Sequence, residues 1–309
     1  MNRKKLTPFF LILALVICIS GVAFASSTDK QGTNYENSGK AVEEYTFNDL
    51  KKIPYIKENI YNSMINSVDF YDAVEGSFTT TFIRAGEDVT IDFKVDIPQQ
   101  VAIESVRGSI ENLQSVCMDE ILYSYNASND DYIECYYASQ LDSSERSVKL
   151  DYNACLPHAQ KMAFFDGEKA IYDRVVTMDD GERGYYYRPD ITNTAYASQC
   201  IFPQSLGMAL LPDMDNWDVS GVRQCLGRQA VVIRGTVTDP SYAEKISSDS
   251  FEMTVDMETG VLLELKGFSG SELTQHIEMK NIHFLSSGAD NGIVNDAKNA
   301  INVINNLTK

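Results

Sequence analysis

The feature that most constrains this chain is a strict alternation of apolar and polar residues. In Val89–Ile97 the apolar residues occupy every odd position and the polar residues every even one. Phe251–Met257 repeats the alternation. A period of two is typical of a β-strand with one buried and one solvated face. Both segments therefore predict half-buried strands.

Looser forms of the same pattern predict many further strands with no helices between them. The candidates are residues 74–82, 101–106, 121–125, 132–137, 148–152, 161–165, 170–176, 184–188, 230–237, 261–266 and 275–284. Asp166-Gly167 is a favoured hairpin turn between two of these strands. The succession predicts a meandering antiparallel sheet within an α+β fold, not a parallel α/β sheet.

The last candidate strand, 275–284, changes its parity halfway. Its apolar residues fall on odd positions up to Met279 and on even positions from Ile282 onward. A β-bulge near Lys280 or Asn281 brings both sets to one face and bends the strand, as a large curved sheet requires.

Two segments have a helical period instead. Between Asn48 and Met64, apolar residues recur every three or four positions, and Pro54 is expected to distort the first part. The tail from Asp290 to Leu307 places its apolar residues along one helical stripe. This pattern predicts a closing helix that packs against the domain.

The first 25 residues indicate the compartment. Arg3, Lys4 and Lys5 precede the apolar stretch from Phe9 to Cys18, and Ala23-Phe24-Ala25 fits the pattern that signal peptidase cuts. We expect a protein that is secreted or lies on the extracytoplasmic face of a bacterial membrane. An uncleaved anchor is the alternative, and membrane association is expected only in that case.

The predicted organisation has four parts. Residues 1–25 form the signal peptide, and residues 26–45, rich in Ser, Thr, Asn and Gly, form a flexible linker. A curved-sheet domain spans residues 46–285, and a C-terminal helix occupies residues 286–309.

The charge balance limits the kind of partner. The chain has 44 Asp and Glu against 26 Lys and Arg, a formal net charge of −18. Nucleic-acid binding needs clustered cations that release counterions from phosphates. We therefore expect no nucleic-acid partner.

Five cysteines follow the signal segment, and none lies in a C-x-x-C pair. A redox site of the thioredoxin type and a zinc ribbon are thus not supported. A disulfide between Cys200 and Cys225 would close a loop of about 25 residues and stabilise the fold by about 3 kcal/mol. The alternative is that the cysteines are small buried residues.

Residue patterns of known chemistry are largely missing. The sequence has no G-x-S-x-G, Walker A, H-E-x-x-H or G-x-G-x-x-G motif. His276 and His283 are expected on a solvated face, and Asp213–Asp218 lacks the spacing of a calcium loop, so Trp217 is expected to anchor a solvated loop. Tyr185 and Tyr187 can share one face of a strand. We predict no catalytic residue, no metal ligand and no cofactor.

The C-terminal half carries a recognisable order of features. Cys-Leu-Gly-Arg-Gln-Ala-Val-Val-Ile-Arg (225–234), Phe-Glu-Met-Thr-Val-Asp-Met-Glu-Thr-Gly (251–260) and a strand ending in Asn-Ile-His-Phe (281–284) follow one another. This order resembles the LolA-like lipoprotein-carrier superfamily, including its RseB-like and its sporulation or germination relatives. Residues 165–172 look like the Asp-Gly hairpin of that superfamily. The resemblance extends over most of residues 46–285 and is strongest over 225–285.

The resemblance implies a strongly curved antiparallel half-barrel whose concave face is covered by helices, with an apolar cleft between them. It implies a non-enzymatic extracytoplasmic protein that binds a lipid, an acylated protein or a protein segment, in envelope or sporulation-related processes. Its partner would be a hydrophobic ligand or an envelope protein. Strand parity then selects the residues expected to line the cleft. They are Phe78, Phe82, Ile91, Phe93, Val95, Phe251, Met253 and Val255.

Three alternatives stay open at this point. The same eight residues could form a closed core, because periodicity does not separate a core from a ligand site. A purely structural envelope protein would have such a filled core. A secreted hydrolase would need a pair of buried carboxylates facing each other in a cleft.

Overall fold

The computed structural model describes residues 46–53, 55–83, 86–108, 112–136, 175–178, 183–185, 187 and 194–307. Several predictions concern residues outside these ranges. They are the signal peptide and linker (1–45), the turn at 166–167, the strands at 148–152 and 161–165, and most of the strand at 170–176.

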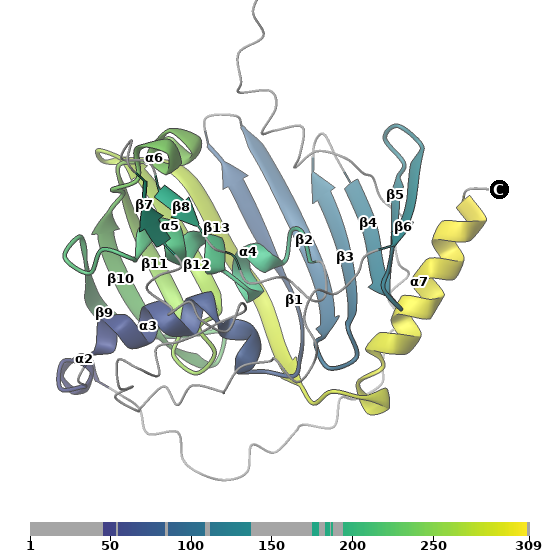
Figure 1. Ribbon diagram of the computed structural model, residues 1–309, viewed down its shortest axis with the longest axis horizontal. Coiled ribbons are helices and arrows are strands. Elements are labelled where there is room, and N and C mark those ends of the chain that lie inside the picture. Colours follow the sequence, from purple (N-terminus) through teal and green to yellow (C-terminus); the bar gives the residue numbers. More distant parts are fainter. Residues whose placement is uncertain are drawn as a thin grey trace, which may run out of the picture.

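One antiparallel sheet dominates the structure (Figure 1). Its first strands are β1 (Ala73–Phe82), β2 (Glu87–Asp96), β3 (Val101–Gly108), β4 (Asn112–Met118), β5 (Ile121–Asn126) and β6 (Asp131–Tyr136). The others are β9 (Trp217–Cys225), β10 (Arg228–Thr236), β11 (Ser250–Asp256), β12 (Leu262–Ser269) and β13 (Glu272–Leu285). The 11 strands follow the order β6-β5-β4-β3-β2-β1-β13-β12-β11-β10-β9, so two meanders meet where β1 pairs with β13. The predicted meandering antiparallel sheet is confirmed.

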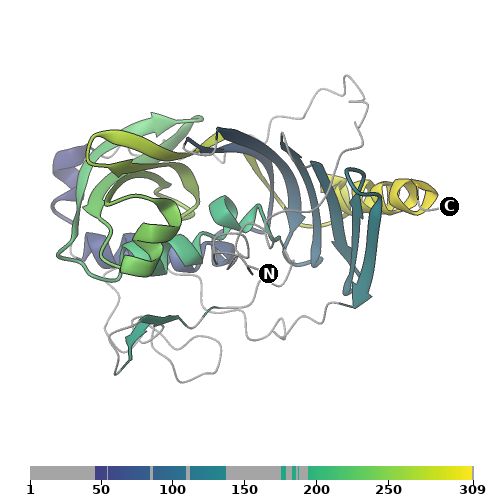
Figure 2. The same cartoon turned by 90° about the horizontal axis from the view of Figure 1, so that it is seen from above.

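The sheet is strongly curved and does not close into a barrel, as the view from above shows (Figure 2). One source of curvature is a bulge in β13. Ser77 pairs with Asn281 and the next residue, Phe78, pairs with Met279, so Lys280 has no partner on β1. The bulge predicted near Lys280 or Asn281 is confirmed, and it keeps Met279 and Ile282 buried on the same side of the strand.

Helices α3 (Ile56–Ile65), α4 (Ser198–Ile201) and α5 (Gln204–Leu210) lie on the concave side of the sheet (Figures 1 and 2). A short helix, α2 (Phe47–Leu50), precedes α3 and contacts β9. The helix expected over 48–64 is thus present as two pieces, α2 and α3. The short helices α4 and α5 were not predicted, nor was α6 (Pro240–Ile246), which Asp239 caps by accepting a hydrogen bond from the Tyr242 backbone N–H.

The C-terminal helix α7 (Ile293–Leu307) lies on the opposite, convex side, against β2 to β5 (Figures 1 and 2). Its buried residues are Ile293, Ala297, Ala300 and Ile304. They pack against Ala73, Val101, Ile103, Val116, Met118 and Tyr125 of the sheet. The closing helix predicted from the tail is confirmed, and it gives this half of the sheet a second hydrophobic core.

Asp96, at the end of β2, fixes the chain between β13 and α7. Its buried carboxylate accepts hydrogen bonds from the Ser287 hydroxyl at 2.7 Å, the Gly288 backbone N–H at 3.0 Å and the Asn291 amide at 2.7 Å. It also accepts from the Gln99 backbone N–H at 3.1 Å, and a buried carboxylate with four donors is well compensated for its lost hydration. This carboxylate therefore anchors the segment that leads into α7.

Two strands were not predicted. β4 lacks clear alternation, because six of its seven residues are buried. β9 begins at Trp217, which was expected in a solvated loop. The Trp217 side chain is 2% exposed and its indole N–H donates to the Leu211 carbonyl at 3.1 Å, so this residue anchors the edge of the sheet rather than a loop.

Candidate ligand-binding site

The residues predicted to line a cleft share the concave face of the sheet. Seven of the eight are at most 2% exposed, and the eighth, Phe82, is half-buried. Register places Phe78 directly opposite Ile91 on β2 and Met279 on β13. In this structure the seven buried residues belong to one hydrophobic core, and their role as the lining of a ligand cleft stays a prediction.

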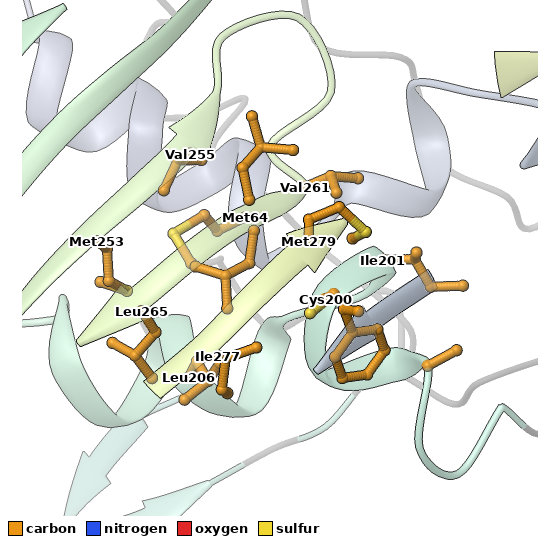
Figure 3. Packing of buried hydrophobic residues seen from close by; sticks show 14 of the residues in the cluster. Met64, Cys200, Ile201, Leu206, Met253, Val255, Val261, Leu265, Ile277 and Met279 are labelled. Carbon is orange, nitrogen blue, oxygen red and sulfur yellow. The ribbon is translucent and has the colours of Figure 1, made fainter. Parts of the chain in front are cut away.

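Helices complete this core from the other side (Figure 3). Met64 of α3, Cys200 and Ile201 of α4 and Leu206 of α5 face the strands. The strand residues that they meet are Met253, Val255, Leu265, Ile277 and Met279. The result is an apolar layer between a curved sheet and short helices. Its flexible methionine side chains include Met253 and Met279 of the strands, Met64 of α3 and Met208 of α5.

Glu104 on β3 holds the start of α4. Its buried carboxylate accepts hydrogen bonds from the backbone N–H of Tyr196 at 3.1 Å and of Ala197 at 2.6 Å. Backbone N–H groups at a helix start lack intrahelical partners, so a carboxylate placed there satisfies them. Sequence reasoning missed this residue, although a charged residue within an otherwise apolar strand segment was a usable signal.

The end of α4 is held by two residues of the segment between α3 and β1. The Ile201 carbonyl accepts hydrogen bonds from the Ser67 hydroxyl at 2.6 Å and the Tyr71 hydroxyl at 2.7 Å. All of these groups are buried. The short helix α4 is therefore attached by polar contacts at both ends and by apolar contacts along its length.

The residues that carried the family resemblance meet in space. Arg228, in the Gly-Arg pair, makes a salt bridge with Asp256, and its guanidinium also donates to Glu258 at 2.6 Å. The Asp256 carboxylate accepts from the backbone N–H of Thr259 at 2.8 Å and from its hydroxyl at 2.9 Å. The Asp-x-x-Thr-Gly segment is thus a turn closed by its own first residue, and Arg228 ties this turn to the neighbouring hairpin.

Gly260 places that turn against α3. Its φ is +74°, and a Cβ atom there would lie 2.3 Å from the Ser63 carbonyl carbon and oxygen. Only glycine combines a positive φ with such a close approach. The turn between β11 and β12 is therefore packed on the backbone of α3 and fixes the height of this helix above the sheet.

The Cys200 and Cys225 thiols are free in the structure, so it does not contain the disulfide that was one of the two alternatives for these residues. Cys200 lies on α4 in the core, where burial raises the pKa of its thiol well above the ordinary value. Cys225 ends β9 and is only partly buried, near Arg223 and Glu264. Cys200 therefore fits the other alternative, a small buried residue without a disulfide.

A charged network covers the other face of β9 to β13. Glu264 accepts from Lys266 at 2.8 Å and contacts the His276 ring nitrogen at 3.0 Å, and it also makes a salt bridge with Arg223. Burial raises the pKa of Glu264, but the hydrogen bonds from Lys266, Arg223 and His276 outweigh it and lower this pKa to about 2. His276 is thus a partly exposed member of an ion network.

No set of three His, Cys, Asp or Glu residues suited to a metal ion occurs within the described ranges.

A two-stranded hairpin, β7 (Val175–Thr177) and β8 (Arg183–Tyr185), lies beside α6. The Tyr185 hydroxyl donates to the Asp239 carboxylate, and Arg183 donates to the Thr238 hydroxyl at 3.1 Å. The Tyr185 and Tyr187 rings lie with centroids 6.2 Å apart, so both occupy one side as their spacing predicts. Burial and the bond to Asp239 raise the pKa of Tyr185.

Buried carboxylates elsewhere have structural partners. Asp96, Glu104, Asp239 and Asp256 each hold a turn or a helix end through backbone N–H groups. None of these four makes a hydrogen bond to another in the described part of the chain.

In the same ranges, no helix reaches the length and apolarity needed to cross a bilayer.

No family model and no curated protein matches this sequence. Solved structures that match include the MucA/MucB complex of Pseudomonas aeruginosa, with 13% identity, a TM-score of 0.38, and coverage of 77% of this chain and 60% of that one. LprF of Mycobacterium bovis matches with 11% identity, a TM-score of 0.36 and coverage of 76% and 95%. The lipoprotein LppX of Mycobacterium tuberculosis matches with 9% identity, a TM-score of 0.35 and coverage of 74% and 94%. The curved antiparallel sheet with helices on its concave face is the fold of this chain.

Proposed function

We propose that this protein is a non-enzymatic binding protein that acts outside the cytoplasm. Its ligand is a lipid, an acylated protein or a hydrophobic protein segment, held between the concave face of the sheet and helices α3 to α5. The observation that carries the proposal is the continuous apolar layer between these elements, which includes seven of the eight residues selected from strand parity. An envelope or sporulation-related process is the proposed setting.

Binding in this layer requires the helical cover to move, because its side chains are packed in the structure. α4 and α5 have four and seven residues, too few to be stable helices without tertiary contacts. Each methylene buried contributes roughly 0.8 kcal/mol, so a chain of about 14 methylenes contributes about 11 kcal/mol. This is of the same order as the roughly 4 to 15 kcal/mol cost of association. Displacing α4 would expose the apolar surface that this helix covers in the structure. The binding energy of a ligand of this size would offset that loss only if the ligand covered most of the same surface.

The test is native mass spectrometry of the secreted protein, followed by organic extraction and identification of released molecules. We expect an added mass that extraction removes and that belongs to an acyl lipid or an apolar peptide. A matched pair of variants locates the site: Met253→Ala alters the apolar layer, and Glu272→Ala alters an exposed residue of β13. Loss of the added mass in both variants, or in neither, would contradict a site in this layer.

A structural envelope protein is the second candidate, and the packed core favours it. Phe78 and Met253 are completely buried, as a protein without a ligand cleft requires. An empty protein that stays empty when incubated with detergent-solubilised envelope lipids would support this candidate over the binding protein.

A further inference from the structure

The strand β6, at one edge of the sheet, has features of a docking site for another strand. It forms the end of the strand order and pairs with β5 in unbroken register from Asp131 opposite Asn126 to Tyr136 opposite Ile121. Within the described ranges no strand pairs with its other side. Five of the six residues of β6 are exposed, among them Ile133 at 48% and Tyr136 at 71%, so the described part of the chain leaves this strand open to solvent. An exposed, regular edge presents backbone donors and acceptors to an added strand.

The opposite edge of the sheet differs. β9 has a register shift where Ser220 bulges from its pairing with β10, and α2 contacts the strand. The Lys57 ammonium donates to the Trp217 carbonyl at 2.5 Å and makes a salt bridge with Asp218 at 2.7 Å. Bulges and covered backbone groups are ordinary ways to block edge pairing. β9 is blocked in this manner, and among the described residues none blocks β6 in the same way.

Charge selects the kind of segment that fits β6. No Lys or Arg occurs between Arg107 and Arg146 in the sequence. The acids in and next to β6 are Asp119, Glu120, Asp130, Asp131 and Glu134. A second copy of β6 would bring two sets of these acids to one edge, and their mutual repulsion would oppose pairing, whereas cations on the added strand would stabilise it.

We propose that β6 binds an extended cationic segment of a partner protein, which adds to the sheet as a further strand. Glu134 lies on the same face as Tyr132 and Tyr136, and their hydroxyls donate to Glu134 and Glu120 at 2.6 Å each. The other face of the strand carries Asp131, Ile133 and Cys135. Because side chains alternate along a strand, the best partner has basic residues at every second position and apolar residues between them. This inference concerns a surface separate from the apolar layer and does not depend on the function proposed above.

The test measures binding of short synthetic peptides to the full protein by fluorescence anisotropy. The first peptide alternates Lys and Val over about seven residues, an ordinary strand length. The second has the same sequence with alternate backbone nitrogens methylated, which removes the hydrogen bonds of one edge, and the third alternates Glu and Val. We expect the first peptide to bind and the Glu peptide not to bind. The methylated peptide should bind with an affinity at least about tenfold lower than that of the first.

Variants and a thiol readout locate the binding. Asp131→Asn with Glu134→Gln is expected to weaken the Lys peptide about fivefold, because exposed ion pairs contribute modestly. Asp88→Asn with Glu272→Gln removes two exposed acids outside β6 and is expected to leave binding unchanged. Bound peptide should also slow alkylation of the exposed Cys135.

Three outcomes would overturn the proposal. Equal binding of the methylated peptide would mean charge attraction without strand addition. An equal loss in both double variants would mean that net charge, not β6, attracts the peptide. A dimer in sedimentation velocity that itself protects Cys135 would make a second copy the occupant of this edge.

Discussion

The Glu104 carboxylate on β3 lies 2.6 Å from the backbone nitrogen of Ala197, where α4 begins. These residues are 93 positions apart in the chain, and their bond joins the two layers that enclose the apolar core. A single side chain of the sheet thus determines where a short helix can start. The same contact is the most direct place to loosen the helical cover.

Glu104→Ala is expected to reduce the free energy of unfolding by about 1 to 3 kcal/mol, because the buried Ala197 N–H and the partly buried Tyr196 N–H lose their acceptor. It should also increase binding of a hydrophobic fluorescent dye under native conditions, since α4 is released. Urea unfolding and a dye titration check both. Glu272→Ala, on an exposed residue, is the control. Lower stability without added dye binding would mean that Glu104 supports the sheet but not the cover.

Gly260→Ala is expected to be much more destabilising than Gly270→Ala. Both glycines have a positive φ, +74° and +60°, so both variants carry the backbone cost of an alanine there. Only at Gly260 would the added Cβ collide with the backbone of α3, whereas nothing lies within 4 Å of a Cβ at Gly270. Thermal unfolding of the pair separates the two effects. Equal losses would show that the turn does not rest on α3.

Glu264 should make stability depend on acid pH. Its pKa is lowered to about 2 in the folded chain, against about 4.3 for an unfolded glutamate. The unfolded state therefore takes up the proton first, so the stabilisation is present above about pH 4.3 and is lost as the pH falls toward 2. Urea unfolding between pH 5 and pH 2 should show a shallower decline for Glu264→Gln than for the unaltered protein. A decline of unchanged slope would argue that the network with Lys266, Arg223 and His276 does not persist in solution.

The cysteines should differ in reactivity. Cys135 is exposed and should be alkylated in the native protein, whereas Cys200 should react only after unfolding, because burial raises the pKa of its thiol. Peptide mapping under non-reducing conditions should find no cross-link between Cys200 and Cys225. Detection of that cross-link would restore the disulfide expected from the sequence.

Much of the sheet is predictable from sequence, because one face is buried and the other solvated. Val89–Ile97 was expected as a strand and β2 occupies Glu87–Asp96, while Phe251–Met257 became β11 at Ser250–Asp256. Even the bulge at Lys280 followed from a change in parity. β4 escaped prediction because residues buried on both faces do not alternate.

The helical cover was less predictable. α4 and α5 are too short to show a period, and almost every residue of α5 is buried, so no polar face marks it as a helix. Parity selected Phe78 and Met253 correctly as inward-facing residues. It carries no information on what packs above them, and for that reason contacts such as Glu104 with Ala197 emerge only from the fold.

The pairing of β1 with β13 determines when the sheet can be completed. Ser77 and Asn281, joined by a hydrogen bond across these strands, are 204 residues apart in the chain. Contacts of such high sequence separation slow folding, because a long loop must close before they form. During synthesis, β1 has an unpaired edge until nearly the whole chain has been made, and the first meander must avoid wrong pairings for that time. The protein is thus expected to fold slowly and to depend most on chaperones before β13 emerges.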